Sequence, residues 1–206
     1  MKKVLLLSAA FVALSAMDVQ AAQERVYGSV KIGASFSQDK ADDAKEDFSH
    51  VLTDFAVGMK ISDCVRAEAA FAYRGESDKT ETAAAGYASY SEKDTVSAWT
   101  LGVNAYYDIK TGTKLTPYVT AGAGLAKMSF DIDVKAFDGV NYAALSETYS
   151  KVSFSWNVGA GVSYELNDRL ALDVGYRYTD FGSFKKDDVK FKGKANEVTA
   201  GVRFLF

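Results

Sequence analysis

The sequence predicts an all-β protein whose strands form an eight-stranded antiparallel up-and-down transmembrane β-barrel. Three observations support this fold class. Apolar and polar residues alternate with a period of two along most of the chain. The connections between the alternating segments are short and long in turn. Beyond the N-terminal segment, no apolar run reaches the length of a membrane-spanning helix. Such a chain can cross a membrane only with strands.

The N-terminal segment has the layout of an export signal. Two lysines precede an apolar run over residues 4–16, and small residues suited to cleavage follow at 19–21. We therefore expect residues 1–21 to be a signal peptide. Residues 22–206 then form the barrel domain, exported to the cell outer membrane of a Gram-negative bacterium.

Eight segments of the mature chain alternate clearly enough to be predicted as strands. The clearest is 152–166, where eight apolar residues share one face and serine, asparagine, glycine and glutamate share the other. An even number of strands is typical of single-chain bacterial barrels. The predicted strands are 25–37, 49–61, 65–74, 95–109, 116–130, 152–166, 170–181 and 196–206.

The polar faces carry charges at mid-strand, and this indicates which face lines the lumen. A soluble lipocalin also alternates, but with its apolar face inward. Here charges of opposite sign recur on the polar face, as a narrow, neutralised lumen requires. We predict a structural charge network in the lumen, formed by Arg66, Glu68, Asp173, Arg177, Glu197 and Arg203.

The connections and the aromatic residues agree with an outer-membrane barrel. Short periplasmic turns are predicted at 62–64, 110–115 and 167–169, and long external loops at 38–48, 75–94, 131–149 and 182–195. The apolar faces also carry aromatic side chains near strand ends, where aromatic girdles lie. These are Tyr73, Trp99, Tyr107, Trp156, Tyr164, Tyr176 and Tyr178.

The final strand ends on an aromatic residue and predicts a second partner besides outer-membrane lipid. Val202, Phe204 and Phe206 share one face. We interpret them as the assembly signal that the barrel-assembly machinery reads.

Several function classes find no support in the sequence. The net charge of −3 argues against a nucleic-acid partner, and a single cysteine, Cys64, excludes an internal disulfide. The one histidine, His50, would need a serine two residues later to resemble a lipid A deacylase, but Leu52 stands there. We therefore expect no enzyme activity, no catalytic or metal site and no cofactor.

Three segments resemble a known family. They are LALDVGYRYTDFG at 170–182, NEVTAGVRFLF at 196–206 and LGVNAYYDIKTGTKLTPYVTAGAGLA at 101–126. They are similar to the opacity-protein and Neisserial surface protein A-like family of small outer-membrane β-barrels. The resemblance implies a non-enzymatic surface barrel whose external loops contact host molecules. It carries over no binding residues, because the loops do not match motif by motif.

Two functions remain open from the sequence. In the first, a monomeric surface antigen of the opacity or adhesin-like type presents four extracellular loops on a rigid barrel, and the loops contact host surface molecules. The first loop, 38–47, is acidic with net charge −3, and the fourth, 182–195, is basic with net charge +3. The two loops should be neighbours, because strands one and eight close the barrel. The alternative is a small porin-like channel, although eight strands leave a lumen that side chains fill.

Overall fold

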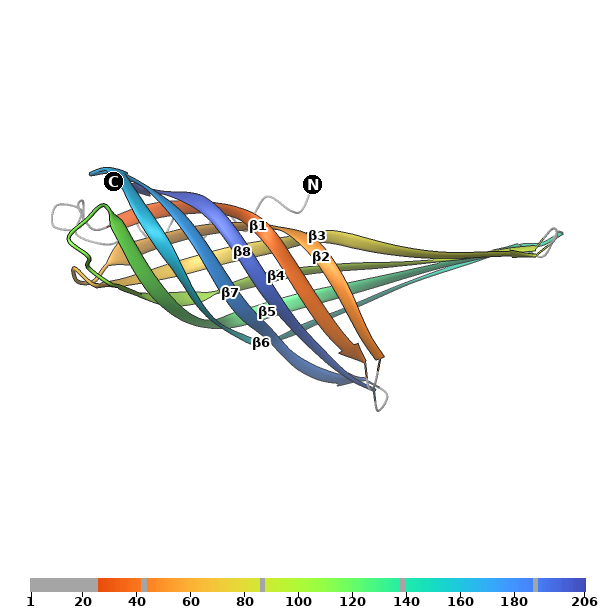
Figure 1. Cartoon of the computed structure of the whole chain (residues 1–206). Coiled ribbons are helices and arrows are strands. Elements are labelled where there is room, and N and C mark those ends of the chain that lie inside the picture. The colour runs from red at the N-terminus through yellow and green to blue at the C-terminus, as the bar shows by residue number, and fades with distance from the viewer. Residues whose placement is uncertain (1–25, 42–43, 86–87, 138–139, 187–188) are drawn as a thin grey trace.

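The chain forms a closed barrel of eight antiparallel strands, each paired with its neighbours in sequence and the last paired with the first (Figure 1). This confirms the predicted fold class. The computed structural model describes residues 26–41, 44–85, 88–137, 140–186 and 189–206. The strands are β1 (Val26–Ala41), β2 (Ala44–Lys60), β3 (Val65–Ala85), β4 (Ala88–Asp108), β5 (Leu115–Phe137), β6 (Tyr142–Asn167), β7 (Leu170–Lys186) and β8 (Val189–Leu205).

The apolar faces of the strands point outward, and the polar faces point into the barrel. Ile32 is 61% exposed and Phe154 is 63% exposed, whereas Arg66 and Glu68 are buried inside. The aromatic residues expected on the outer face include Tyr107 and Trp156, and both are exposed there. A closed sheet with this polarity presents a lipid-compatible wall and a polar lumen.

The two ends of the barrel differ. At one end, short connections join β2 to β3, β4 to β5 and β6 to β7, as predicted. We call this the short-turn end. The opposite end, the hairpin end, carries the connections near residues 42–43, 86–87, 138–139 and 187–188, which lie outside the described residues.

The strands at the hairpin end are longer than the alternation predicted. The segments expected as long loops, 75–94 and 131–149 above all, are largely strand. The physical reason is that a hairpin can continue the backbone ladder of its own strands once the barrel has set their register. Outside the membrane neither face has to be apolar, so these segments lack the alternation that reveals a strand.

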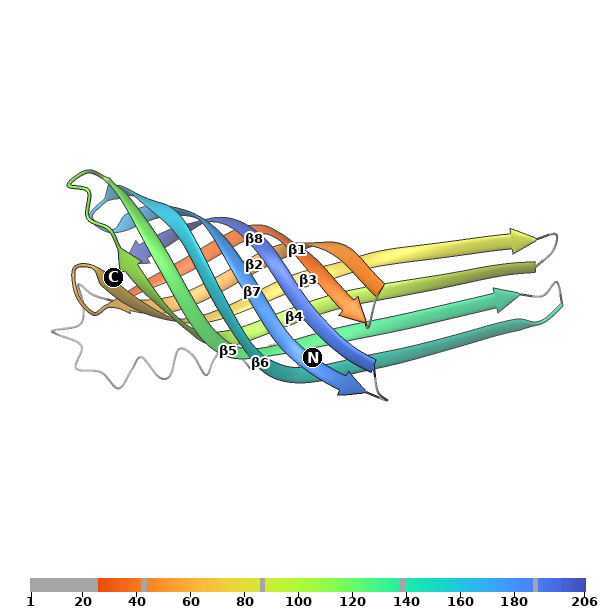
Figure 2. The ribbon, with the colours of Figure 1, turned by 60° about the horizontal axis from the view of Figure 1, so that its bottom comes forward.

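Four strands extend beyond the barrel as one sheet (Figures 1 and 2). The pairing of β2 with β3 stops at Leu52 and Arg74, and the pairing of β6 with β7 starts at Trp156 and Asp180. The pairing of β3 with β4, β4 with β5 and β5 with β6 continues to the tips. We call this extension, residues 75–85, 88–97, 129–137 and 142–155, the projecting sheet.

The first and last strands pair along most of their lengths. Their register runs from Tyr27 opposite Leu205 to Ala41 opposite Phe191. The predicted first and fourth loops are therefore neighbours, as expected from barrel closure.

The predicted signal peptide, residues 1–21, lies outside the described residues. Within the described part of the chain, no helix has the length and apolar character to cross a membrane.

Candidate functional site

Among the described residues, ten charged side chains in the lumen form ion pairs, five of them cationic and five anionic. All six predicted network residues are among them, and the structure places each inside the barrel. In a narrow polar lumen each buried ion requires a partner of opposite charge. The ten are Lys31, Arg66, Arg74, Arg177, Arg203, Asp54, Glu68, Asp108, Asp173 and Glu197.

Glu197 of β8 organises the charge cluster nearest the hairpin end. Its carboxylate pairs with Arg74 of β3 at 2.6 Å and with Arg177 of the adjacent β7 at 2.7 Å. It also accepts hydrogen bonds from Ser35 at 3.3 Å and Thr179 at 3.1 Å. Glu197 is fully buried, so one carboxylate joins four strands across the lumen.

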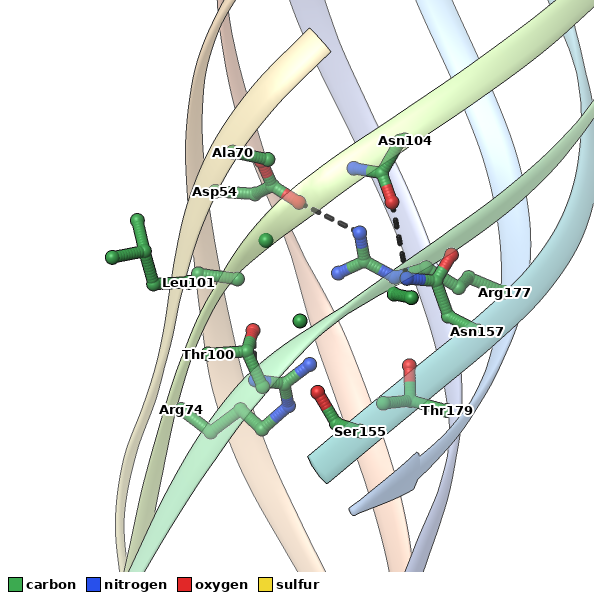
Figure 3. A pocket seen from close by; sticks show the side chains of 14 residues that line it. Asp54, Ala70, Arg74, Thr100, Leu101, Asn104, Ser155, Asn157, Arg177 and Thr179 are labelled. Atoms are coloured by element: carbon green, nitrogen blue, oxygen red, sulfur yellow. Dashed lines mark hydrogen bonds and ion pairs between the residues drawn. The ribbon is translucent and has the colours of Figure 1, made fainter. Parts of the chain in front are cut away.

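Arg177 extends this cluster to β2. Its Nη1 atom lies 2.9 Å from Asp54 Oδ2, and the neighbouring amide of Asn157 donates to Asn104 Oδ1 at 3.0 Å (Figure 3). These side chains surround a cavity of about 20 Å³. That volume suits about one water molecule rather than a continuous channel.

A second cluster surrounds Arg66, the second residue of β3 counted from the short-turn end. Its guanidinium donates two hydrogen bonds to Asp108, at 2.6 and 2.8 Å, the two-point geometry that makes such pairs strong. Glu68 lies 3.8 Å from Arg66 and 3.6 Å from Lys31, and Lys31 donates to the Tyr106 hydroxyl at 3.2 Å. Two cations, Lys31 and Arg66, and two anions, Glu68 and Asp108, are thus linked in one network.

Three inward-facing tyrosines fill the space around Arg66. The guanidinium carbon lies 4.5 Å from the ring centroid of Tyr106, 5.5 Å from that of Tyr118 and 5.8 Å from that of Tyr27. Glycines on the lumen face make room for these rings. A Cβ atom on Gly161 would lie 2.4 Å from the Tyr118 hydroxyl.

A third cluster closes the lumen toward the short-turn end. Arg203 Nε lies 3.3 Å from Asp173, and Arg203 Nη2 donates to the Ser163 hydroxyl at 3.1 Å. Ser163 in turn donates to Asp173. A cavity of about 250 Å³ lies at the short-turn end of the barrel, between Arg203 and the turn at 167–170.

An apolar layer covers the lumen at the hairpin end. A bulge in the pairing of β7 with β8, between Asp180 and Ser183, contains Gly182 with φ +82°, which favours glycine. Beside it, Phe181 is buried, and the Arg74 guanidinium carbon lies 4.7 Å from its ring centroid. The cluster consists of Ala98, Ala126, Met128, Phe181 and Ala195.

Sequence reasoning missed several lumen residues although the signal was available. Lys31 stands between the outward Val30 and Ile32, so alternation alone assigns it to the lumen. The same parity assigns Asp54, Arg74, Asp108 and the three tyrosines to the inside. The three tyrosines are harder to assign, because tyrosine is also typical of the aromatic girdle on the outer face.

His50 lies near the point where β2 and β3 separate. Its Nδ1 atom is 2.8 Å from the Gly75 carbonyl oxygen, and its Nε2 atom is 3.1 Å from the Ser37 hydroxyl. His50 and Ser37 are both buried. The ring therefore joins β1, β2 and β3 at the rim.

The short-turn end carries the cysteine and an exposed ion pair. Cys64 is a partly exposed free thiol. Asp63 accepts a hydrogen bond from Lys110 at 2.7 Å, and this hydrogen bond and the carboxylate charge raise the pKa of Lys110. Among the described residues, no group of three or more histidine, cysteine, aspartate or glutamate side chains could hold a metal ion.

The three residues of the expected assembly signal lie on the outer wall. Val202 and Phe204 are each 45% exposed, and Phe206 is 59% exposed. The Phe204 and Phe206 rings pack edge to face with centroids 5.6 Å apart. They form one aromatic patch facing the lipid side at the short-turn end.

Comparison with known proteins gives a match to the outer membrane protein beta-barrel domain over residues 4–206. Outer membrane protein PagN of Salmonella typhimurium is 32% identical over 128 residues, which are 55% of this chain and 52% of that protein. Opacity protein V28 of Neisseria gonorrhoeae is 27% identical over 124 residues, 52% of this chain and 51% of that protein. The chain thus spans about half the length of these curated relatives.

A solved structure shows the same fold. The crystal structure of Neisserial surface protein A superposes with a TM-score of 0.55 at 22% identity, covering 88% of this chain and 97% of that one.

Proposed function

Because the chain belongs to the outer membrane protein β-barrel domain family and resides in the outer membrane, we propose that it is a non-enzymatic, adhesin-like surface protein. In this proposal the hairpin end faces the outside, and the projecting sheet and the rim contact host molecules. The resemblance of the sequence to opacity proteins implied this role, and the match to opacity protein V28 supports the proposal.

The projecting sheet is the observation that carries the proposal. From Arg74 to Ala85 the strand β3 continues for eleven residues, or about 36 Å, past its last pairing with β2. Leu145 and the residues on either side of it are exposed, so this stretch of β6 presents both faces to solvent. Function in this class of barrel belongs to segments that the scaffold does not constrain.

Shortened hairpins test the proposal directly. Ser77 pairs with Val96, so residues 78–95 can be replaced by Asn-Gly, which closes a two-residue turn. Phe130 pairs with Tyr149, so residues 131–148 can be replaced in the same way. Each variant and the wild type would be expressed in a non-adherent laboratory bacterium and tested for binding to epithelial cells.

We expect binding by the wild type and loss of binding when both hairpins are shortened, with the boiling-dependent gel shift of the folded barrel retained. Protease treatment of intact cells should cleave the wild type within the projecting sheet. Protection of the hairpins on intact cells, or equal binding by the shortened barrel, would refute the proposal.

A small channel is the alternative function, and the lumen argues against it. The charge clusters around Glu197 and Arg66 cross the barrel with ion pairs of 2.6 to 3.8 Å, and the apolar layer around Phe181 lies beyond them. A cavity of about 20 Å³ at this level leaves no room for a hydrated ion.

A further inference from the structure

The outer strand of the projecting sheet, β6, has an open edge. Residues from Tyr142 pair with β5, but pairing with β7 begins only at Trp156. Ser153 still donates a hydrogen bond to the Phe181 carbonyl oxygen at 2.5 Å. The stretch 142–152 therefore has a strand neighbour on one side only within the described chain. Its other side presents backbone donors and acceptors, a template for strand addition.

The opposite edge of the sheet has more charged residues in its sequence than the β6 edge. Along residues 75–85 of β3 there are four charged residues, and edge charges of this kind discourage pairing between sheets. Along 142–152 there are two, Glu147 and Lys151. Tyr142 is 64% exposed and Val152 is 50% exposed, so side-chain cover is absent from this stretch where its side chains are described.

The two charges on this edge, Glu147 and Lys151, can each pair with the opposite charge on a second copy of the chain. In an antiparallel pair of identical strands, the residue numbers that face each other have a constant sum. With the two-fold axis at position 149, Glu147 of each copy faces Lys151 of the other, and the pairing covers residues 146–152. We propose that two copies of this chain associate through antiparallel pairing of their β6 edges in this register.

The strand direction decides where the two barrels lie. The β6 strand runs from the tip of the projecting sheet to the barrel, so antiparallel pairing points the barrels in opposite directions. Copies in one membrane cannot meet in this way, but copies in two facing membranes can. Seven residues separate position 149 from the barrel rim at Trp156, so the two rims stand about 50 Å apart. This inference rests on the outward orientation in the proposed function.

A charge exchange tests the pairing and its register. The purified full chain would be placed in phosphatidylcholine vesicles, and vesicle clustering would be followed by light scattering. We expect wild-type vesicles to cluster. Glu147→Lys puts two like-charged pairs in the interface, as does Lys151→Glu, and each should weaken clustering about tenfold. A mixture of the two single variants, and the double variant alone, should cluster like the wild type.

Controls separate this pairing from other causes. Glu81→Lys, on the charged β3 edge, should leave clustering unchanged. In a Cys64→Ala background, Glu147→Cys vesicles mixed with Lys151→Cys vesicles should form a disulfide-linked dimer. Absence of wild-type clustering, clustering unaffected by either single charge reversal, or a mixture that fails to recover would overturn the proposal. Strand addition by an unrelated extended peptide would appear as peptide binding without clustering and would also overturn it.

The failure of this inference is distinguishable from failure of the proposed function. Protease cleavage of the hairpins on intact cells tests the orientation alone. Hairpins exposed on cells, combined with vesicles that do not cluster, would leave the host-contact role standing and remove the self-association.

Discussion

Removal of Glu197 tests whether the lumen charges stabilise the barrel. The Glu197 carboxylate is fully buried and bonded to Arg74 at 2.6 Å and Arg177 at 2.7 Å. In Glu197→Ala, Arg177 retains Asp54 at 2.9 Å, but Arg74 loses its only ion pair within the described lumen network. Breaking a buried ion pair by removing one partner costs about 3–5 kcal/mol. Because only one cation is stranded, we expect a loss of about 3 kcal/mol in the free energy of unfolding.

The assay is urea unfolding of the barrel in phospholipid vesicles, followed by tryptophan fluorescence and by the gel shift of the folded form. The matched control is Glu76→Ala, an exposed glutamate on β3, which should change the free energy by less than about 0.5 kcal/mol. Adding Arg74→Met to Glu197→Ala removes the stranded charge, so the double variant should be more stable than Glu197→Ala. Equal midpoints for Glu197→Ala and Glu76→Ala would refute the role assigned to the network.

Three further predictions concern packing, assembly and permeability. Gly161→Ala places a methyl group 2.4 Å from the Tyr118 hydroxyl and should destabilise the barrel by about 1–3 kcal/mol. The control Gly28→Ala meets only ordinary contacts and should leave the stability unchanged. Equal urea midpoints for the two variants would contradict this prediction. Phe206→Ala should lower the fraction of heat-modifiable barrel in cell membranes if the terminal aromatic residue is an assembly signal, whereas the similarly exposed Val198→Ala should not. The wild type in planar bilayers should show no steady conductance, and regular single-channel steps would contradict the filled lumen.

The sequence was sufficient to predict the barrel because its main signal is local. Successive residues of a strand face opposite sides, so parity alone separates Arg66 and Glu68 from their apolar neighbours. The same parity would have assigned Lys31 and Tyr106 to the lumen. Tyr106 was missed because tyrosine suits the membrane interface as well as a packed interior.

The strand ends at the hairpin end could not be predicted by the same means. Residues 75–85 show no apolar alternation, since successive residues such as 82–84 are exposed on both faces of the strand. Their strand structure comes from hydrogen bonds to β4, whose register is set inside the barrel at pairs such as Phe71 and Leu101. A pattern along one segment does not contain that information.

The sequence by itself determined the number of strands, the face of each strand that meets lipid and the side on which each charge lies. Only the tertiary structure decided which charges meet. Arg74 and Glu197 are 123 residues apart, as are Asp54 and Arg177, and both pairs form across the lumen. Their contact depends on strand tilt and on the stagger with which β8 closes on β1, and these are properties of the closed sheet as a whole. The position of a residue along its strand determines whether its side chain faces the lumen or the lipid, whereas closure of the barrel determines which side chain it pairs with.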